Sequence, residues 1–196
     1  HVPLMLLPEA TKVLISGGGD GATLREVLKH ERVHATLVDI DGEVVKCSKN
    51  YLPSLHQGAW DHERATVIIG DGIKFCKETD ERFDVVIIDS TDPEEDGPSS
   101  VLYQTDFYTA CKRVLRDPKR GVVLTQNGHP QFESYPQKAL SHLAACFEHT
   151  TVYQFSVPTY MGGIQAFGFA SDGDLLNSIT VEEAEKAWDA ENVETE

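Results

Sequence analysis

Apolar and polar positions follow two alternating periods along the chain. Short apolar runs rich in Val and Ile are followed by segments whose apolar residues recur at helical spacing, as at Leu24, Val27 and Leu28. The run at residues 85–88 contains no polar position, which is typical of a strand buried on both faces of a sheet. This alternation predicts an α/β fold in which helices cover both faces of a mainly parallel sheet.

Seven strands and six helices follow from this pattern. Strands are predicted at residues 12–16, 35–40, 65–69, 83–89, 121–126, 151–157 and 164–170. Helices are predicted from the first glycine cluster to residue 30, then at 42–51, 72–78, 105–115, 135–147 and 180–189, the last with a capping box formed by Thr180 and Glu183. The last two strands have a tight connection and predict an antiparallel edge. This Rossmann-like, seven-stranded, mostly parallel sheet is the arrangement of the adenosylmethionine-dependent methyltransferases, whereas a NAD-binding fold would have six parallel strands.

Composition narrows the classes of partner. The chain has 17 basic and 32 acidic residues, a formal net charge of −15, which argues against a nucleic-acid partner. No apolar run is long enough to span a membrane and no signal peptide is visible, so we expect a cytoplasmic protein with no membrane partner. The four cysteines have no C-x-x-C spacing and are expected to be reduced thiols without a metal. Residues 1–171 are predicted to form the catalytic domain, and residues 172–196 an acidic helical tail.

A glycine cluster joins the first predicted strand to the first predicted helix. Gly17, Gly18, Gly19 and Gly21 allow a tight turn whose backbone can approach a ligand, as in nucleotide-binding α/β units. Asp20 lies inside this turn. A carboxylate there would repel a pyrophosphate and attract a cation, so the turn is predicted to face a positively charged ligand.

Acidic residues follow the other predicted strands. Asp39 lies 22 positions after Gly17, near the spacing at which a carboxylate reaches a ribose hydroxyl pair. Asp71 could accept a hydrogen bond from adenine, cap the following helix, or do both through different oxygens. Asp89 and Asp92 would suit a diamine, because one carboxylate can remove a proton while the other holds the far ammonium. Asp92 could instead form a turn before a proline.

Histidine supplies no candidate site. Single histidines without a metal-ligand spacing are expected to be surface or helix residues, namely His30, His34, His56, His62 and His142.

Six motifs in one order carry a family resemblance. They are the segments 17–21 (GGGDG), 38–41 (VDID), 70–72 (GDG), 89–93 (DSTDP), 126–128 (QNG) and 158–163 (PTYMGG). With them, the chain resembles the spermidine synthases and, more broadly, the polyamine aminopropyltransferases over roughly residues 2–172. The resemblance implies transfer of an aminopropyl group from decarboxylated S-adenosylmethionine to putrescine, giving spermidine and methylthioadenosine. It implies no tightly bound cofactor and a homodimer or homotetramer.

The resemblance also implies roles for individual residues. The nucleoside donor would be bound by Gly17, Gly19, Asp20, Asp39, Asp71, Gly72 and Pro98. Asp89 would be the catalytic base. The acceptor amine would be bound by Asp89, Ser90, Thr91, Asp92, Gln126 and Tyr160.

The chain departs from the family in three respects. Asp39 stands where the family usually has Glu, and the loop at residues 92–98 is about two residues longer and more acidic. The family's N-terminal β-rich domain does not precede His1, so we expect a shortened and weakly active chain.

Three other functions remain as alternatives to aminopropyl transfer. They are an adenosylmethionine-dependent methyltransferase, a NAD-dependent oxidoreductase that uses the loose glycine pattern, and a non-catalytic binding or oligomerisation module.

Overall fold

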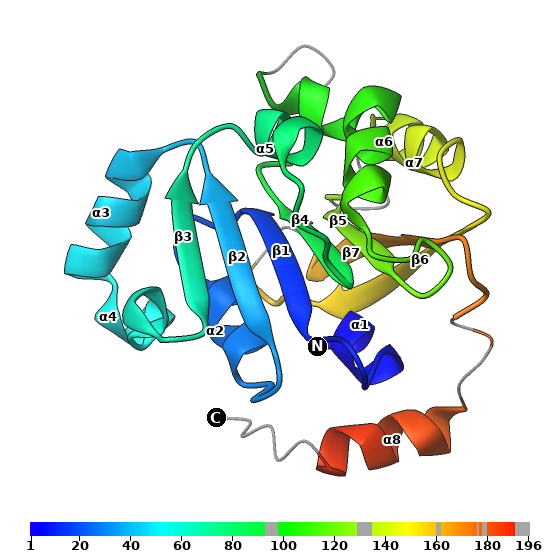
Figure 1. Cartoon of the computed structure of the whole chain (residues 1–196), viewed down its shortest axis with the longest axis horizontal. Helices are drawn as coiled ribbons and strands as arrows, with labels where there is room; N and C mark the ends of the chain where they lie inside the picture. Colours follow the sequence, from blue (N-terminus) through cyan, green and yellow to red (C-terminus); the bar gives the residue numbers. More distant parts are fainter. Residues whose placement is uncertain (93–97, 129–134, 160–161, 176, 178–179, 191–196) are drawn as a thin grey trace.

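A mixed sheet forms the centre of the molecule (Figure 1). The computed structural model describes residues 1–92, 98–128, 135–159, 162–175, 177 and 180–190. The strands are β1 (Lys12–Gly17), β2 (His34–Asp39), β3 (Ala65–Ile69), β4 (Val85–Asp89), β5 (Val122–Gln126), β6 (His149–Ser156) and β7 (Ile164–Ser171). The α-helices are α1 (Val2–Leu6), α2 (Ala22–Leu28), α3 (Gly42–Tyr51), α4 (Pro53–His56), α5 (Gly72–Glu78), α6 (Thr105–Val114), α7 (Tyr135–Ala144) and α8 (Val181–Ala190). The described residues also include two short 3-10 helices, η1 (Ala59–Asp61) and η2 (Pro98–Tyr103).

The strand order is β3-β2-β1-β4-β5-β7-β6. Strands β1 to β5 pair in parallel, and β7 runs antiparallel to both β5 and β6. The predicted seven-stranded, mostly parallel sheet with an antiparallel edge is therefore confirmed, with β7 one strand in from the edge and β6 outermost. The chain order reverses between β1 and β4. In open α/β sheets ligands bind beyond the carboxyl ends of the strands at such a reversal.

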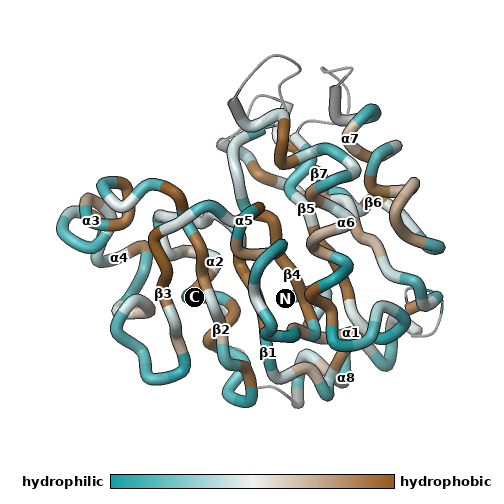
Figure 2. The backbone as a smooth tube through the Cα atoms, turned by 45° about the horizontal axis from the view of Figure 1, so that its top comes forward, coloured by the Kyte–Doolittle hydropathy of each residue, from teal (hydrophilic) through white to brown (hydrophobic). Residues whose placement is uncertain are grey.

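Two apolar cores lie on opposite faces of the sheet. On one face, Val13, Ile15 and Ile87 pack against residues of α1, α2 and η1. On the other face, Leu14 and Val86 pack against residues of α5, α6 and α7. Figure 2 shows the apolar colouring concentrated in the central strands, with mostly hydrophilic connecting loops. Successive residues of a central strand enter the two cores in turn, which explains why these strands are continuous apolar runs in the sequence.

The sequence pattern missed four short helices: α1, α4, η1 and η2. Each has six residues or fewer, which is too short for a helical period to stand out, and α1 and α4 begin at or next to a proline with no side-chain cap. The longer helices were predicted to within a few residues. The predicted capping box of α8 is confirmed, since Thr180 and Glu183 exchange hydrogen bonds of 2.8–3.2 Å.

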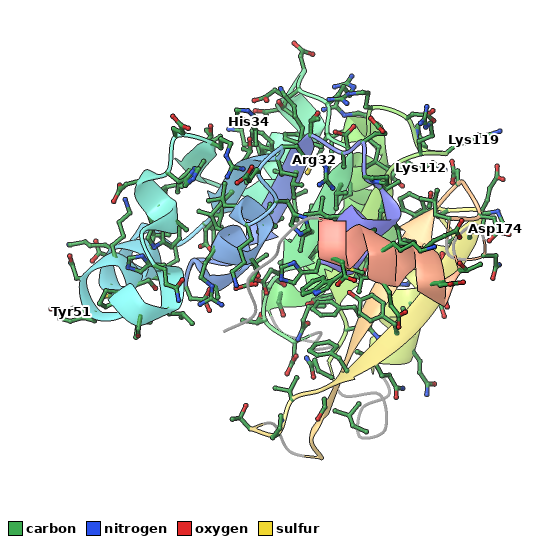
Figure 3. All side chains as sticks on the ribbon, turned by 90° about the horizontal axis from the view of Figure 1, so that it is seen from below. Arg32, His34, Tyr51, Lys112, Lys119 and Asp174 are labelled. Carbon is green, nitrogen blue, oxygen red and sulfur yellow. The ribbon has the colours of Figure 1, made fainter. Side chains whose placement is uncertain are left out.

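The amino ends of the strands are covered by α1 and α8, which contact each other (Figure 3). Arg32 ties α1 and the following segment to the sheet by donating to the carbonyl oxygens of Leu4 (2.9 Å) and Ala10 (3.0 Å). None of the helices among the described residues is long and apolar enough to cross a membrane.

Two of the histidines that were expected to be surface or helix residues are buried, and one of these, His56, is the last residue of α4. His30 is fully buried and His56 is 8% exposed. His30 lies against the ring of His1, with 3.0 Å between His30 Nε2 and His1 Nδ1, and burial lowers the pKa of His30 to about 4. Both residues lie at or just after the end of a helix, where the helical pattern does not distinguish the buried face from the exposed one.

Candidate active site

The glycine turn after β1 lies directly against the end of β4. Gly17 is the register partner of Asp89, and Gly18 N donates to the Asp89 carbonyl at 2.8 Å. A β-carbon at Gly17, whose φ is +91°, would lie 2.0 Å from that carbonyl oxygen. Only glycine allows this approach, so the turn and the catalytic candidate Asp89 are held together by backbone contacts.

Two carboxylates lie on either side of the same turn. A β-carbon at Gly18 would be 3.1 Å from Asp89 Oδ2, and one at Gly19 would be 2.7 Å from Asp39 Oδ2. Larger residues would therefore displace one carboxylate or the other. The glycines therefore allow the carboxylates at the ends of β2 and β4 to lie close to the turn after β1.

Several of the acids also start a helix or a turn. Asp20 Oδ1 accepts from Ala22 N at 2.9 Å, and Asp71 Oδ1 accepts from Ile73 N at 2.8 Å and from Lys74 N at 3.2 Å. In both residues Oδ2 makes no hydrogen bond to the described part of the chain. The predicted capping role of Asp71 is confirmed, and one oxygen is left for another contact.

Asp39 and Asp41 form a similar pair after β2. Asp39 Oδ1 accepts from Asp41 N at 2.8 Å, and Asp41 caps α3 by accepting from Glu43 N and Val44 N. Two apolar neighbours are exposed. Ile40 lies between the two acids in the chain and is 75% exposed, and Ile69, the register partner of Asp39, is 52% exposed. Exposed apolar residues beside carboxylates suit a ligand that has both an apolar ring and polar groups.

The surroundings of Asp89 shift its pKa. Burial raises its pKa, a hydrogen bond from Thr23 Oγ1 to Asp89 Oδ2 (2.5 Å) lowers it, and the negative charges of Asp20 and Asp39 raise it further. The balance is a pKa above the usual value for aspartate. Perturbed carboxylates of this kind are typical of groups that accept or donate protons in catalysis.

A second polar cluster follows β4. The buried hydroxyl of Tyr103 lies 2.6 Å from the Thr91 carbonyl, 3.1 Å from Gln126 Oε1 and 3.2 Å from Ser90 Oγ. Gln126 in turn donates through Nε2 to Asp92 Oδ1. Tyr103 therefore fixes the segment that carries Asp92 relative to the end of β5.

The structure brings together most of the residues that the sequence singled out. The glycine turn with Asp20, Asp39 and Asp89 forms one group, and Ser90, Thr91, Asp92 and Gln126 form the adjoining one. Gly72 lies against β1, because a β-carbon there would be 2.3 Å from Ser16 Oγ. Tyr160 and residues 93–97 lie outside the described residues, and Pro98 begins η2.

Sequence reasoning missed two site residues, Thr23 and Tyr103. Thr23 lies in the first turn of a helix and Tyr103 lies at the end of a 3-10 helix, and neither belongs to a polar motif. No sequence signal distinguishes them from ordinary helix residues. Among the described residues, no group of three or more His, Cys, Asp or Glu side chains could hold a metal ion.

The fold and the acid-lined strand ends define a Rossmann-like domain of the methyltransferase type. A solved structure of human methyltransferase-like protein 13 in complex with SAH has the same fold, with a TM-score of 0.72 at 18% identity, and the match covers 100% of this chain and 88% of that one. This likeness concerns the fold alone.

The chain belongs to the spermine/spermidine synthase domain family, whose model matches residues 1–182. A polyamine aminopropyltransferase of Ruegeria sp. (strain TM1040) is 44% identical over 181 residues, covering 91% of this chain and 62% of the relative. Polyamine aminopropyltransferase 1 of Pseudomonas aeruginosa is 44% identical over 185 residues, covering 93% of this chain and 63% of the relative. The predicted family is therefore confirmed, and the chain spans about three fifths of the length of these relatives.

Solved structures agree with this assignment. A spermidine synthase in complex with the transition state analogue AdoDATO is 38% identical, with a TM-score of 0.86, and the match covers 95% of this chain and 63% of that one. The spermidine synthase from Thermotoga maritima is 36% identical, with a TM-score of 0.84, and the match covers 95% of this chain and 62% of that one.

Proposed function

We propose that this chain is the catalytic domain of a polyamine aminopropyltransferase, which transfers an aminopropyl group from decarboxylated S-adenosylmethionine to putrescine. The observation that carries the proposal is the half-buried Asp89 at the reversal point of the sheet, beside Asp20 and Asp39. Relatives with the names polyamine aminopropyltransferase and spermidine synthase support it.

The chemistry needs a base. A primary alkylamine has a pKa near that of lysine, about 10.4, so it is protonated and not nucleophilic at neutral pH. Asp89 accepts a proton from the amine as the nitrogen attacks the carbon beside the sulfonium. The new N–C bond forms, the C–S bond breaks, and its electron pair leaves with sulfur as the neutral thioether methylthioadenosine. A carboxylate whose pKa is raised is a stronger base for this step than an ordinary aspartate.

The remaining acids bind and orient the two substrates. On this proposal Asp20 holds the ammonium of the donor, Asp39 its ribose, and Asp71 its adenine beside the apolar Ile40 and Ile69. Asp92, fixed through Gln126, holds the far ammonium of the acceptor and so sets the line of attack. An acidic site of this kind favours a donor without a carboxylate.

Release of methylthioadenosine from decarboxylated S-adenosylmethionine and putrescine tests the proposal. We expect Asp89→Asn to lower turnover by at least about 100-fold, since general base catalysis contributes roughly that much or more, while binding of methylthioadenosine is retained. Asp117→Asn, the same change in the loop before β5 at the amino ends of the strands, is the matched control. No release of methylthioadenosine by the wild-type protein would refute the proposal.

Ligand binding separates the proposal from a methyltransferase of the same fold. Calorimetry with intact and decarboxylated S-adenosylmethionine compares the two donors directly. Tighter binding of the decarboxylated form is expected, because the intact donor brings a carboxylate into an acidic site. Tighter binding of the intact form would favour methyl transfer instead.

Several predictions go with this function. We expect no tightly bound cofactor, a homodimer or homotetramer, a cytoplasmic location and a division of the chain after residue 171. Size measurement of the purified protein tests the oligomer, and limited proteolysis tests the division.

A further inference from the structure

Thr23 lies in the first turn of α2 and contacts Asp89 across the glycine turn. Its Oγ1 is 2.5 Å from Asp89 Oδ2. An ionised carboxylate has no hydrogen to donate, so the threonine hydroxyl is the donor. Hydrogen bonds to charged acceptors are shorter and stronger than those between neutral groups, and this one links the helix after the turn to the candidate base.

The two oxygens of Asp89 have different surroundings. Oδ2 is the oxygen that receives the Thr23 hydroxyl, and it is also the atom that a side chain at Gly18 would meet at 3.1 Å. Oδ1 makes no hydrogen bond within the described residues. One oxygen is therefore held by the protein, and the other is available to a substrate.

The surroundings of Asp89 otherwise oppose its negative charge. Burial and the charges of Asp20, in the glycine turn, and Asp39, at the end of β2, disfavour the ionised form. Those two acids are the charged groups that act on Asp89 among the described residues. The Thr23 hydroxyl acts in the opposite direction and stabilises the carboxylate.

We propose that Thr23 is a positioning residue of the reaction, whose hydroxyl fixes Asp89 Oδ2, keeps the carboxylate ionised and leaves Oδ1 to take the proton from the acceptor amine. This inference rests on the proposed function for its catalytic part. Its structural part, the hold of Thr23 on Asp89, is independent of turnover. The bonds that form and break are those of the aminopropyl transfer, and the proton moves from the amine nitrogen to Asp89 Oδ1.

The structural part is tested by carbon-13 NMR titration of the Asp89 carboxyl, assigned by comparison with Asp89→Asn. Thr23→Val keeps the shape of the side chain and removes the hydroxyl, so the titration midpoint of Asp89 should move to higher pH. Thr23→Ser keeps the hydroxyl and should titrate like the wild type. If Thr23→Val does not fold, Thr23→Ala serves the same purpose. An unchanged midpoint in the variant without a hydroxyl would overturn the proposal whether or not the chain is active.

The catalytic part is tested by the pH dependence of kcat. Loss of a hydrogen bond to a charged group should lower kcat by about tenfold on the acid side of the profile and move that limb to higher pH. The KM for the donor should change little, and Thr23→Ser should restore the wild-type profile. An acid limb that does not move in Thr23→Val, or a loss that Thr23→Ser shares, would instead show a merely structural role. A wild-type protein without turnover would refute the proposed function and leave the NMR result to decide the role of Thr23.

Discussion

Asp89 bears its negative charge in a place where burial and two neighbouring acids disfavour it. Its pKa in the folded protein is raised, so the folded state binds a proton more readily than the unfolded state does. Stability therefore falls as the pH rises from the ordinary aspartate value of 3.8 through the raised pKa. The residue proposed to act as base is also a source of instability at neutral pH.

Asp89→Asn should consequently raise the melting temperature at pH 7 while turnover is lost. The amide oxygen can still accept from Thr23, and the variant carries no buried charge. The gain should be about 2–4 °C for each kcal/mol recovered. Differential scanning calorimetry at several pH values is the measurement, and the difference from wild type should shrink as the pH falls toward 3.8. A lower melting temperature for the variant at pH 7 would contradict a destabilising charge at Asp89.

At the scale of elements, the start of α5 packs against the end of β1. Gly72 leaves room for Ser16, since a β-carbon at Gly72 would lie 2.3 Å from Ser16 Oγ. Ser16 is only 4% exposed, so its hydroxyl has little space to move. The glycine is required by packing here.

Gly72→Ala should therefore destabilise the fold by about 1–3 kcal/mol, the usual effect of overpacking a closely packed contact. Adding Ser16→Ala removes the clashing hydroxyl and should recover most of that loss. Urea denaturation of the wild type, both single variants and the double variant measures the coupling. Additive effects of the two substitutions would contradict the packing explanation.

Regular elements were predictable from the sequence, and their contacts were not. The apolar runs of β1 and β4 are continuous because successive residues enter cores on opposite faces, which is a local pattern. The acids at the strand ends could also be placed, because parallel strands bring their carboxyl ends to one edge. By contrast, the contact of Thr23 with Asp89 spans 66 positions, and the buried Tyr103 looks like any helix residue. Such partners depend on tertiary packing that no local pattern records.

At the scale of the whole molecule, the side opposite the acid cluster has its own polar contacts. His30 is fully buried beside His1, and burial lowers its pKa to about 4 from 6.5. The unfolded state binds a proton below pH 6.5 and the folded state resists it until about pH 4. Stability from this residue is therefore present above pH 6.5 and is lost as the pH falls through that window.

His30→Gln should remove this acid-dependent component. Urea denaturation between pH 7 and pH 4 would then show a shallower loss of stability for the variant than for wild type. His34→Gln, at an exposed position labelled in Figure 3, controls for the general effect of replacing a histidine. Equal slopes for His30→Gln and wild type would mean that other groups govern acid unfolding.

Several carboxylates at the strand ends have both a structural contact and a proposed ligand contact, and this limits which substitutions the site can accept. Asp41 and Asp71 each use one oxygen to cap a helix, and loss of such a cap costs about 1 kcal/mol, while Asp20 uses one oxygen to hold the turn before α2. A substitution that alters the proposed donor site therefore also weakens the scaffold. Within the part of the chain that the structure describes, Asp92 and Gln126 cap no helix and bond to each other. If the proposed roles hold, evolution or design toward another acceptor amine meets less resistance there, so we expect acceptor choice to vary among relatives more than the donor side does.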